Sequence, residues 1–191
     1  MILATNNKGK LQEVRKILNE YKIYSLNDKD IHIDVEEDQE TFYGNAKKKA
    51  LKIYDLSKEE TIADDSGLCV NALNGFPGVM THRFLGEDAT DQERNQYIID
   101  EVNKLDDRSA KVVCVLVYYN GHDIISTEGV IEGSISKFRR GTNGFGFDEI
   151  FELPDGRTLA ELSPEDKNEL SARAIAAKEL KLKLEKIKWE D

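Results

Sequence analysis

Two adjacent carboxylates, Asp64 and Asp65, stand in the stretch IADDSGL from Ile62 to Leu68. Apolar residues that lead into carboxylates, a hydroxyl and a glycine are typical of a buried strand that delivers polar groups to a cleft. Adjacent strand residues point to opposite faces, so we expect one aspartate to serve a ligand and the other to be structural. The ligand-binding carboxylate would suit Mg²⁺, which takes hard oxygen ligands and bridges to substrate phosphates. A simple Asx-type turn with Gly67 at positive φ is the alternative.

A second candidate site is the loop TNNKGK, from Thr5 to Lys10. It separates the apolar segment at residues 1–4 from LQEVRKIL, whose apolar residues keep helical spacing, so the pattern predicts strand, loop and helix. Lys8, Lys10 and the first backbone N–H groups of the helix would favour an anion there. The loop is not a Walker sequence, and a polar strand-to-helix turn without a ligand remains the alternative.

A third candidate is the glycine-rich stretch FRRGTNGFGFDEIF, which runs from Phe138 to Phe151. Its glycines allow the backbone to approach a ligand closely, and Phe145 and Phe147 offer ring faces on which a nucleobase can stack. Both aromatic side chains could instead enter the core, and we favour that interpretation for Phe147.

An acidic run that includes Glu36 and Glu37 precedes a predicted helix at residues 41–57. Most charge runs are solvated faces. Here, however, a carboxylate just ahead of the helix could reach a metal held by Asp65. In the helix itself, Lys49 is the lysine that we expect to face a phosphate.

The remaining pattern alternates strands and helices. Strands are predicted at residues 21–26, 111–119 and 123–135, the last two joined as a hairpin by Asn120-Gly121. Thr90 caps a predicted helix to about Asn103, and Ser163-Pro164 starts a C-terminal helical segment. The hairpin makes the sheet mixed, so the predicted fold class is α/β.

Length and composition limit the possible functions. The 191 residues suit a single domain, 1–191, which can have two lobes. A net charge of −10 disfavours nucleic acid and anionic membranes as partners, so any phosphate site needs a local basic cluster. Two cysteines, no signal-peptide pattern and no apolar run long enough to span a bilayer indicate a soluble protein of a reducing cytoplasm.

Five segments in order, TNNKGK, ADDSGL, NGFPGV, GTNGFGFD and LSPEDKNELSAR, resemble the inosine triphosphate pyrophosphatase family over essentially the whole chain. The resemblance implies an elongated mixed sheet flanked by helices, two lobes with a central nucleotide-binding cleft, and usually a homodimer. It further implies hydrolysis of noncanonical purine nucleoside triphosphates (ITP, dITP and XTP) to the monophosphate and pyrophosphate, with Mg²⁺.

By position, the resemblance makes Asp65 the catalytic residue, which binds metal and activates water, with Ser66 touching substrate. Glu36 matches the second metal ligand, although the acidic run leaves Glu37 as the alternative. The resemblance also implies three groups of substrate contacts: a phosphate loop at residues 5–10, a purine pocket, and residues on the C-terminal side. In the purine pocket, Phe145 would stack on the base and Asp148 would accept a hydrogen bond from it. These residues are Thr5, Asn6, Asn7, Lys8, Gly9 and Lys10, then Phe145, Gly146, Phe147 and Asp148, and then Lys167, Ala172 and Arg173.

The chain departs from the family pattern at two positions. The family's usual Ser-His-Arg is Ser171, Ala172 and Arg173 here, so an imidazole expected to help read the 6-oxo group is absent. The usual Glu before Asn45 is Gly44. Two alternatives stay open: a related pyrophosphatase for modified pyrimidine triphosphates and, because Ala172 replaces the usual histidine, a catalytically weakened nucleotide-binding homologue.

Overall fold

The computed structural model describes residues 1–86 and 88–190, with side chains to residue 186. Five strands form one sheet in the order β1-β2-β3-β4-β5. β1 pairs parallel with β2 and β4 antiparallel with β5, so the sheet is mixed and the predicted α/β class is confirmed. The elements are β1 (Ile2–Leu3), α1 (Lys8–Ile17), α2 (Phe42–Ser57), β2 (Thr61–Val70), α3 (Asp91–Val102), β3 (Ser109–Tyr119), β4 (Ile124–Ile135), β5 (Phe151–Glu152), α4 (Pro164–Leu170) and α5 (Ala172–Glu190), with short 3-10 turns at Asn27–Lys29, Asn71–Leu73, Gly78–Met80 and Leu159–Glu161.

The chain forms two compact units. The first comprises Met1–Asp65, Cys114–Gly129 and Ala172–Asp191, and the second Ser66–Val113 and Val130–Ser171. β2, β3 and β4 each pass from one unit to the other along their length.

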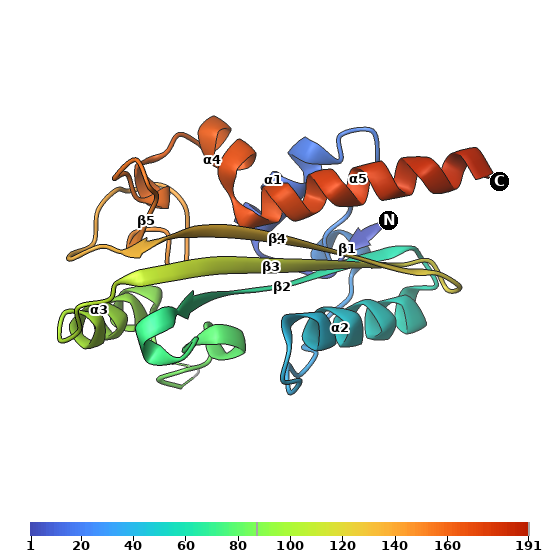
Figure 1. The fold of residues 1–191 in the computed structure, drawn as a ribbon. Helices are drawn as coiled ribbons and strands as arrows, with labels where there is room; N and C mark the ends of the chain where they lie inside the picture. The colour runs from blue at the N-terminus through green and yellow to red at the C-terminus, as the bar shows by residue number, and fades with distance from the viewer. Residues whose placement is uncertain (87, 191) are drawn as a thin grey trace. The chain divides into compact units, whose positions relative to one another are not determined.

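In the first unit, α1 and α5 pack together on one face of the strands and α2 covers the opposite face (Figure 1). α1 begins at Asn7, whose side chain accepts a hydrogen bond from the Lys10 N–H. α2 begins at Thr41, whose side chain accepts from the Gly44 N–H, and it buries Ala46, Ala50 and Ile53. Both predicted helices are therefore present, each set by its cap and its apolar stripe.

The predicted strand at residues 21–26 is wrong. Only Tyr24 pairs with β1, through an isolated bridge to Ile2. The chain then turns, because Ser25 and Asp28 cap each other: the Ser25 N–H donates to Asp28 Oδ2 at 2.8 Å and the Asp28 N–H donates to Ser25 Oγ at 3.0 Å. Reciprocal side-chain bonds of this kind compete with a strand ladder.

In the second unit, α3 lies on one side of the strand segments and α4 on the other (Figure 1). α3 begins at Thr90 with a complete capping box to Glu93. The helix predicted from Ser163-Pro164 ends after Leu170, and a new helix, α5, begins at Ala172. No helix in the described part of the chain is both long enough and apolar enough to cross a membrane.

Candidate functional site

A buried network of charges joins the first unit's α1, β2 and α5. Lys10 Nζ lies 2.9 Å from Asp64 Oδ2, and the same oxygen accepts from Arg173 Nη2 at 3.0 Å. A second guanidinium nitrogen of Arg173, Nη1, donates to Glu13 Oε2 at 2.8 Å. All four side chains are nearly or fully withdrawn from solvent. Asp64 is thus the structural member of the aspartate pair, held by two cations.

The register of the sheet explains how these residues meet. β1 and β2 run parallel with Leu3 opposite Ile62, so the loop after β1 and the aspartates after Ile62 come to the same end of the two strands. Lys10 and Glu13 are three residues apart on α1 and therefore share a face. Arg173 arrives at the first turn of α5, directly after the break at Ser171.

Charge stabilises Asp64 in its ionised form. Burial opposes ionisation, but the ammonium of Lys10 and the guanidinium of Arg173 outweigh it and hold the pKa of Asp64 well below its usual value. Asp64 therefore carries a negative charge throughout the physiological range and is unsuited to exchange protons during a reaction.

Asp65 has a different environment. It is 3% exposed and accepts a hydrogen bond at 2.9 Å from Nδ2 of Asn45, a buried residue of α2. Its pKa is raised to about 6, mainly by burial; Lys49 opposes the rise, and the nearby Glu37 adds to it. An aspartate with such a pKa can change its ionisation state near neutral pH, as a catalytic acid or base must.

Lys49 and Glu37 complete this second group. Lys49 Nζ lies 2.7 Å from Glu37 Oε1, and both side chains are largely buried. Burial opposes the charge on Lys49, yet Asp64, Glu37 and Asp65 together raise its pKa, so the ammonium stays charged. Glu37 faces inward, whereas the neighbouring Glu36 is exposed.

A cavity of about 230 Å³ opens in the first unit beside both groups. Apolar side chains, among them Leu26 and Ile53, line one part of it. The polar lining mixes loop, acidic and basic side chains, and consists of Thr5, Asn6, Asp34 and Asp64 with Lys10, Glu37 and Lys49. A site of this size with two ammonium groups can receive an anionic group of a ligand.

The loop at residues 5–10, which we call the predicted phosphate loop, is held by its own side chains. Thr5 Oγ1 accepts from the Asn7 N–H at 3.1 Å, and Asn6 Oδ1 accepts from the Asn27 N–H at 2.9 Å. The Lys10 N–H donates to Asn7 Oδ1. The N–H groups of Lys8 and Gly9 also belong to the first turn, where an α-helix provides no backbone acceptor of its own. Of the predicted residues, Asn7, Lys8 and Gly9 are not part of the described cavity lining, and Lys8 is exposed.

The donor set fits a magnesium ion. Asp65 and Glu37 supply hard oxygen atoms, and Mg²⁺ is typically held by one or two carboxylates together with waters and substrate phosphates. Three cations, Lys10, Lys49 and Arg173, face the four carboxylates of Glu13, Glu37, Asp64 and Asp65, and the exposed Asp34 adds a fifth. A divalent cation would neutralise that excess of negative charge. Among the described residues, no cluster of three or more His, Cys, Asp or Glu side chains is placed to hold a metal by itself.

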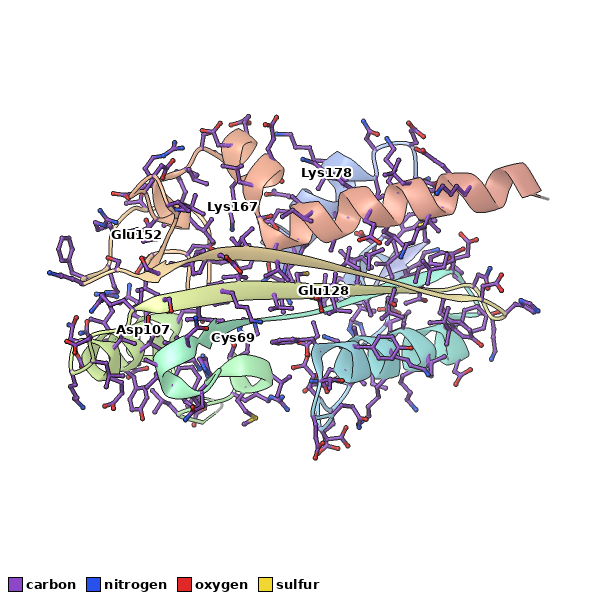
Figure 2. The ribbon with its side chains drawn as sticks, viewed as in Figure 1. Cys69, Asp107, Glu128, Glu152, Lys167 and Lys178 are labelled. Atoms are coloured by element: carbon purple, nitrogen blue, oxygen red, sulfur yellow. The ribbon has the colours of Figure 1, made fainter. Side chains whose placement is uncertain are left out.

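The second unit holds the predicted base-recognition residues together. Asp148 Oδ2 accepts from the Phe145 N–H at 2.7 Å and from Lys167 Nζ at 2.5 Å. The Lys167 ammonium lies 4.2 Å from the centre of the Phe145 ring. Figure 2 shows the labelled Lys167 side chain pointing from α4 into the unit, in accord with its 8% exposure.

The glycines of this loop are required by its geometry. Gly144 has φ +85°, and a Cβ there would lie 2.1 Å from Asp148 Oδ2, so a side chain would displace the carboxylate that organises the loop. Gly146 has φ +62° and separates Phe145 from Phe147. Both aromatic side chains are half-buried.

Other predicted residues are buried. Ser66 and Ala172 are 6% and 2% exposed, and their roles toward substrate stay predictions. At the second departure from the family pattern, a Cβ on Gly44 would lie 2.8 Å from the Cβ of Gln39, so this chain's local packing excludes a larger residue there unless Gln39 moves.

Sequence reasoning missed Glu13, the partner of Arg173, and Asn45, the partner of Asp65. A weak signal existed for Glu13, since it lies between Leu11 and Val14 on the apolar stripe of α1, where a carboxylate is out of place unless it is paired. Nothing local marks Asn45, because its partner lies 20 residues away.

Comparison with known proteins identifies relatives along the whole chain. The model of the Ham1 family matches residues 1–183. A protein of Clostridium tetani named dITP/XTP pyrophosphatase is 39% identical over 191 residues, covering 96% of this chain and 95% of its own. A protein of Aquifex aeolicus with the same name is 40% identical, covering 94% of each chain.

Solved structures of Ham1 proteins also resemble this chain. A HAM1 protein from Coxiella burnetii superposes with a TM-score of 0.87 at 38% identity, covering 97% of this chain and 98% of its own. The Staphylococcus aureus Ham1 protein gives a TM-score of 0.88 at 34% identity with the same coverage.

Proposed function

This chain belongs to the Ham1 family, and we propose that it is a nucleoside-triphosphate pyrophosphohydrolase. Its substrates are noncanonical purine nucleoside triphosphates, ITP, dITP and XTP, which it converts to the monophosphate and pyrophosphate. The names of its full-length relatives support this substrate class. The reaction would remove such nucleotides from the cellular pool.

The observation that carries the proposal is the cavity beside Lys10, Lys49 and Asp64 in a chain of this family. The ammonium groups of Lys10 and Lys49, both largely buried, converge there, and ammonium groups favour phosphate oxygens. We assign the triphosphate to this cavity. A protein with a net charge of −10 attracts an anion only through a local arrangement of this kind.

Asp65 and Glu37 are the proposed ligands of a magnesium ion, with Glu37 replacing our first choice, Glu36, because only Glu37 faces the cavity. When bound, Mg²⁺ supplies charge neutralisation for the phosphates. Asp65 accepts a hydrogen bond from a water molecule, orients it toward the α-phosphorus and takes up its proton, while the bond from that phosphorus to the bridging oxygen of the pyrophosphate breaks. Asn45 fixes the carboxylate. Lys10 and Lys49 stabilise the charge that develops on the departing pyrophosphate.

The second unit's loop is the proposed purine site. Phe145 stacks on the base, while Gly146 and Phe147 surround it. Asp148 acts by holding Phe145 and Lys167 in place. Backbone N–H groups of this loop satisfy a 6-oxo acceptor but meet the amino group of adenine donor to donor. A buried donor left without an acceptor is costly, so ATP is discriminated against.

We further propose that the chain works as a single domain of residues 1–191. A homodimer in the cytoplasm, with no nucleic-acid partner, is the proposed working state. These proposals rest on the family resemblance and on the charge of the chain.

A panel of substrates tests the function. Pyrophosphate release is measured with ITP, XTP, dUTP and ATP, each with Mg²⁺ and with the metal chelated. We expect release from ITP and XTP, little from dUTP and ATP, and none without metal. A preference for dUTP would favour the pyrimidine alternative. Tight ITP binding without release would identify a homologue weakened by Ala172.

A further inference from the structure

Both backbone polar groups of Gly146 are held by a single helix. The Gly146 N–H donates to Asp91 Oδ2 at 2.9 Å, and the Gly146 carbonyl accepts from Asn95 Nδ2 at 2.9 Å. Asp91 and Asn95 are four residues apart on α3, so they lie one above the other on the same face. The partners are 55 and 51 residues away in sequence, which makes this a tertiary contact.

The helix is a firm anchor for these two bonds. Its first turn carries the complete capping box between Thr90 and Glu93. One turn on, the buried guanidinium of Arg94 donates to the carbonyls of Phe84 at 3.0 Å and Gly86 at 2.8 Å, which ties the helix to the preceding segment. The start of α3 therefore has little freedom to move with respect to its own unit.

The two bonds differ in strength. Asn95 is 4% exposed, so its amide cannot exchange the Gly146 carbonyl for water without opening the structure. The Asp91 side chain is 51% exposed and competes with solvent. Removing Asn95 should consequently have the larger effect.

Gly146 determines how Phe145 is presented. At φ +62° its backbone is in the left-handed region, where small rotations redirect both neighbouring residues. Phe145 has its other anchors at the Asp148 carboxylate and the Lys167 ammonium. The α3 contacts add a restraint at Gly146, the residue that directly follows Phe145 in the chain.

We propose that Asp91 and Asn95 are positioning residues for base recognition, which hold the Gly146 backbone and thereby orient Phe145 toward the purine. This inference rests on the proposed function and deepens it. It places a determinant of substrate specificity on α3, outside the loop that touches the base.

Steady-state kinetics with ITP test the inference. We expect Asn95→Ala to raise the KM for ITP roughly tenfold with kcat nearly unchanged, because a binding contact is lost equally from ground and transition states. The inhibition constant of inorganic pyrophosphate, which has no base, should not change. A general loss of structure would instead alter both constants.

Two variants at the exposed Asp91 keep the inference testable if Asn95→Ala, at a buried position, fails to fold. Asp91→Ala should raise the KM for ITP about threefold, whereas Asp91→Asn keeps an acceptor oxygen and should stay near wild type. Both remove the charge near the helix N-terminus, so their difference isolates the hydrogen bond. Gln96→Ala, on the exposed face of the same helix, is the control.

Unchanged KM values in Asn95→Ala and Asp91→Ala, or equal shifts in the pyrophosphate inhibition constant, would overturn the inference. Failure of the wild-type protein to release pyrophosphate from any substrate would overturn the proposed function and the inference with it. The two failures are distinguished by the wild-type measurement alone.

Discussion

Two nitrogen atoms of Arg173 donate hydrogen bonds to the same carboxylate oxygen of Asp64, Nε at 3.3 Å and Nη2 at 3.0 Å. The two residues are 109 positions apart, and both are buried. Lys10 approaches that oxygen as well, so a single carboxylate joins the phosphate loop to the start of α5. Asp64 thus joins α1, β2 and α5 beside the cavity, while its neighbour Asp65 is the residue proposed to take part in catalysis.

The first prediction concerns the stability that this network confers. Arg173→Met should lower the free energy of unfolding by about 3–5 kcal/mol. The substitution leaves the buried carboxylate of Glu13 without this cation, and it removes one of the two cations that pair with Asp64. Urea unfolding followed by circular dichroism measures the change. Arg157→Met, which removes an exposed pair with Asp155, is the control and should leave the midpoint nearly unchanged. Equal midpoints for all three proteins would contradict the role of Arg173.

The second prediction is a pH dependence set by Asp65. Its pKa is about 6 in the folded chain against an ordinary 3.8, so the folded state binds the proton more tightly than the unfolded state. The resulting stabilisation is complete below about pH 3.8 and is lost as the pH rises through 6. Asp65→Asn should therefore be more stable than wild type at pH 7.5 by about 1–3 kcal/mol, but not at pH 4.

Magnesium provides the control for that experiment. In metal-free buffer at pH 7.5, added Mg²⁺ should raise the unfolding midpoint of the wild-type protein and have less effect on Asp65→Asn, because ligand binding to the folded state stabilises it. An Asp65→Asn variant less stable than wild type at pH 7.5, or one that responds to Mg²⁺ equally, would contradict this account of Asp65.

The sequence predicted the parts of the fold that short segments encode. Thr41 and Thr90 cap the helices expected after them, and the parallel pairing of β1 with β2 brings the phosphate loop to the aspartates. The predicted strand around Tyr24 failed because the mutual capping of Ser25 and Asp28 turned the chain.

The site could be predicted only in part. Residue types and the resemblance pointed to Asp65 and Lys10, but the choice between Glu36 and Glu37 depends on which of two adjacent side chains turns inward. The contact between Asn95 and Gly146 joins segments 51 residues apart, and no local pattern records such a pairing. Partners of this kind follow from tertiary packing alone.

The third prediction separates the phosphate site from the base site. Lys10→Ala should weaken inhibition by pyrophosphate roughly tenfold and leave inhibition by inosine monophosphate nearly unchanged, since the proposed partner of Lys10 is a terminal phosphate. Lys8→Ala, at an exposed position outside the described cavity lining, should have a smaller effect. Equal weakening of both inhibitors by Lys10→Ala would argue against this placement.

The fourth prediction concerns Ala172, where the family pattern has histidine. Ala172→His should raise kcat/KM for ITP selectively, because one hydrogen bond to a buried carbonyl contributes about 1–3 kcal/mol, roughly five- to a hundredfold. The poor reaction with ATP should stay nearly unchanged. If kcat/KM rises equally for both substrates, Ala172 limits catalysis and does not read the base.

The central claim is cleavage between the α- and β-phosphates of a purine triphosphate with a 6-oxo group. Phosphorus NMR of the products formed from ITP and Mg²⁺ tests it most directly. The account predicts inosine monophosphate and pyrophosphate in equal amounts, with no orthophosphate and far slower turnover of ATP under the same conditions. Release of orthophosphate with inosine diphosphate, or equal turnover of ATP, would contradict it.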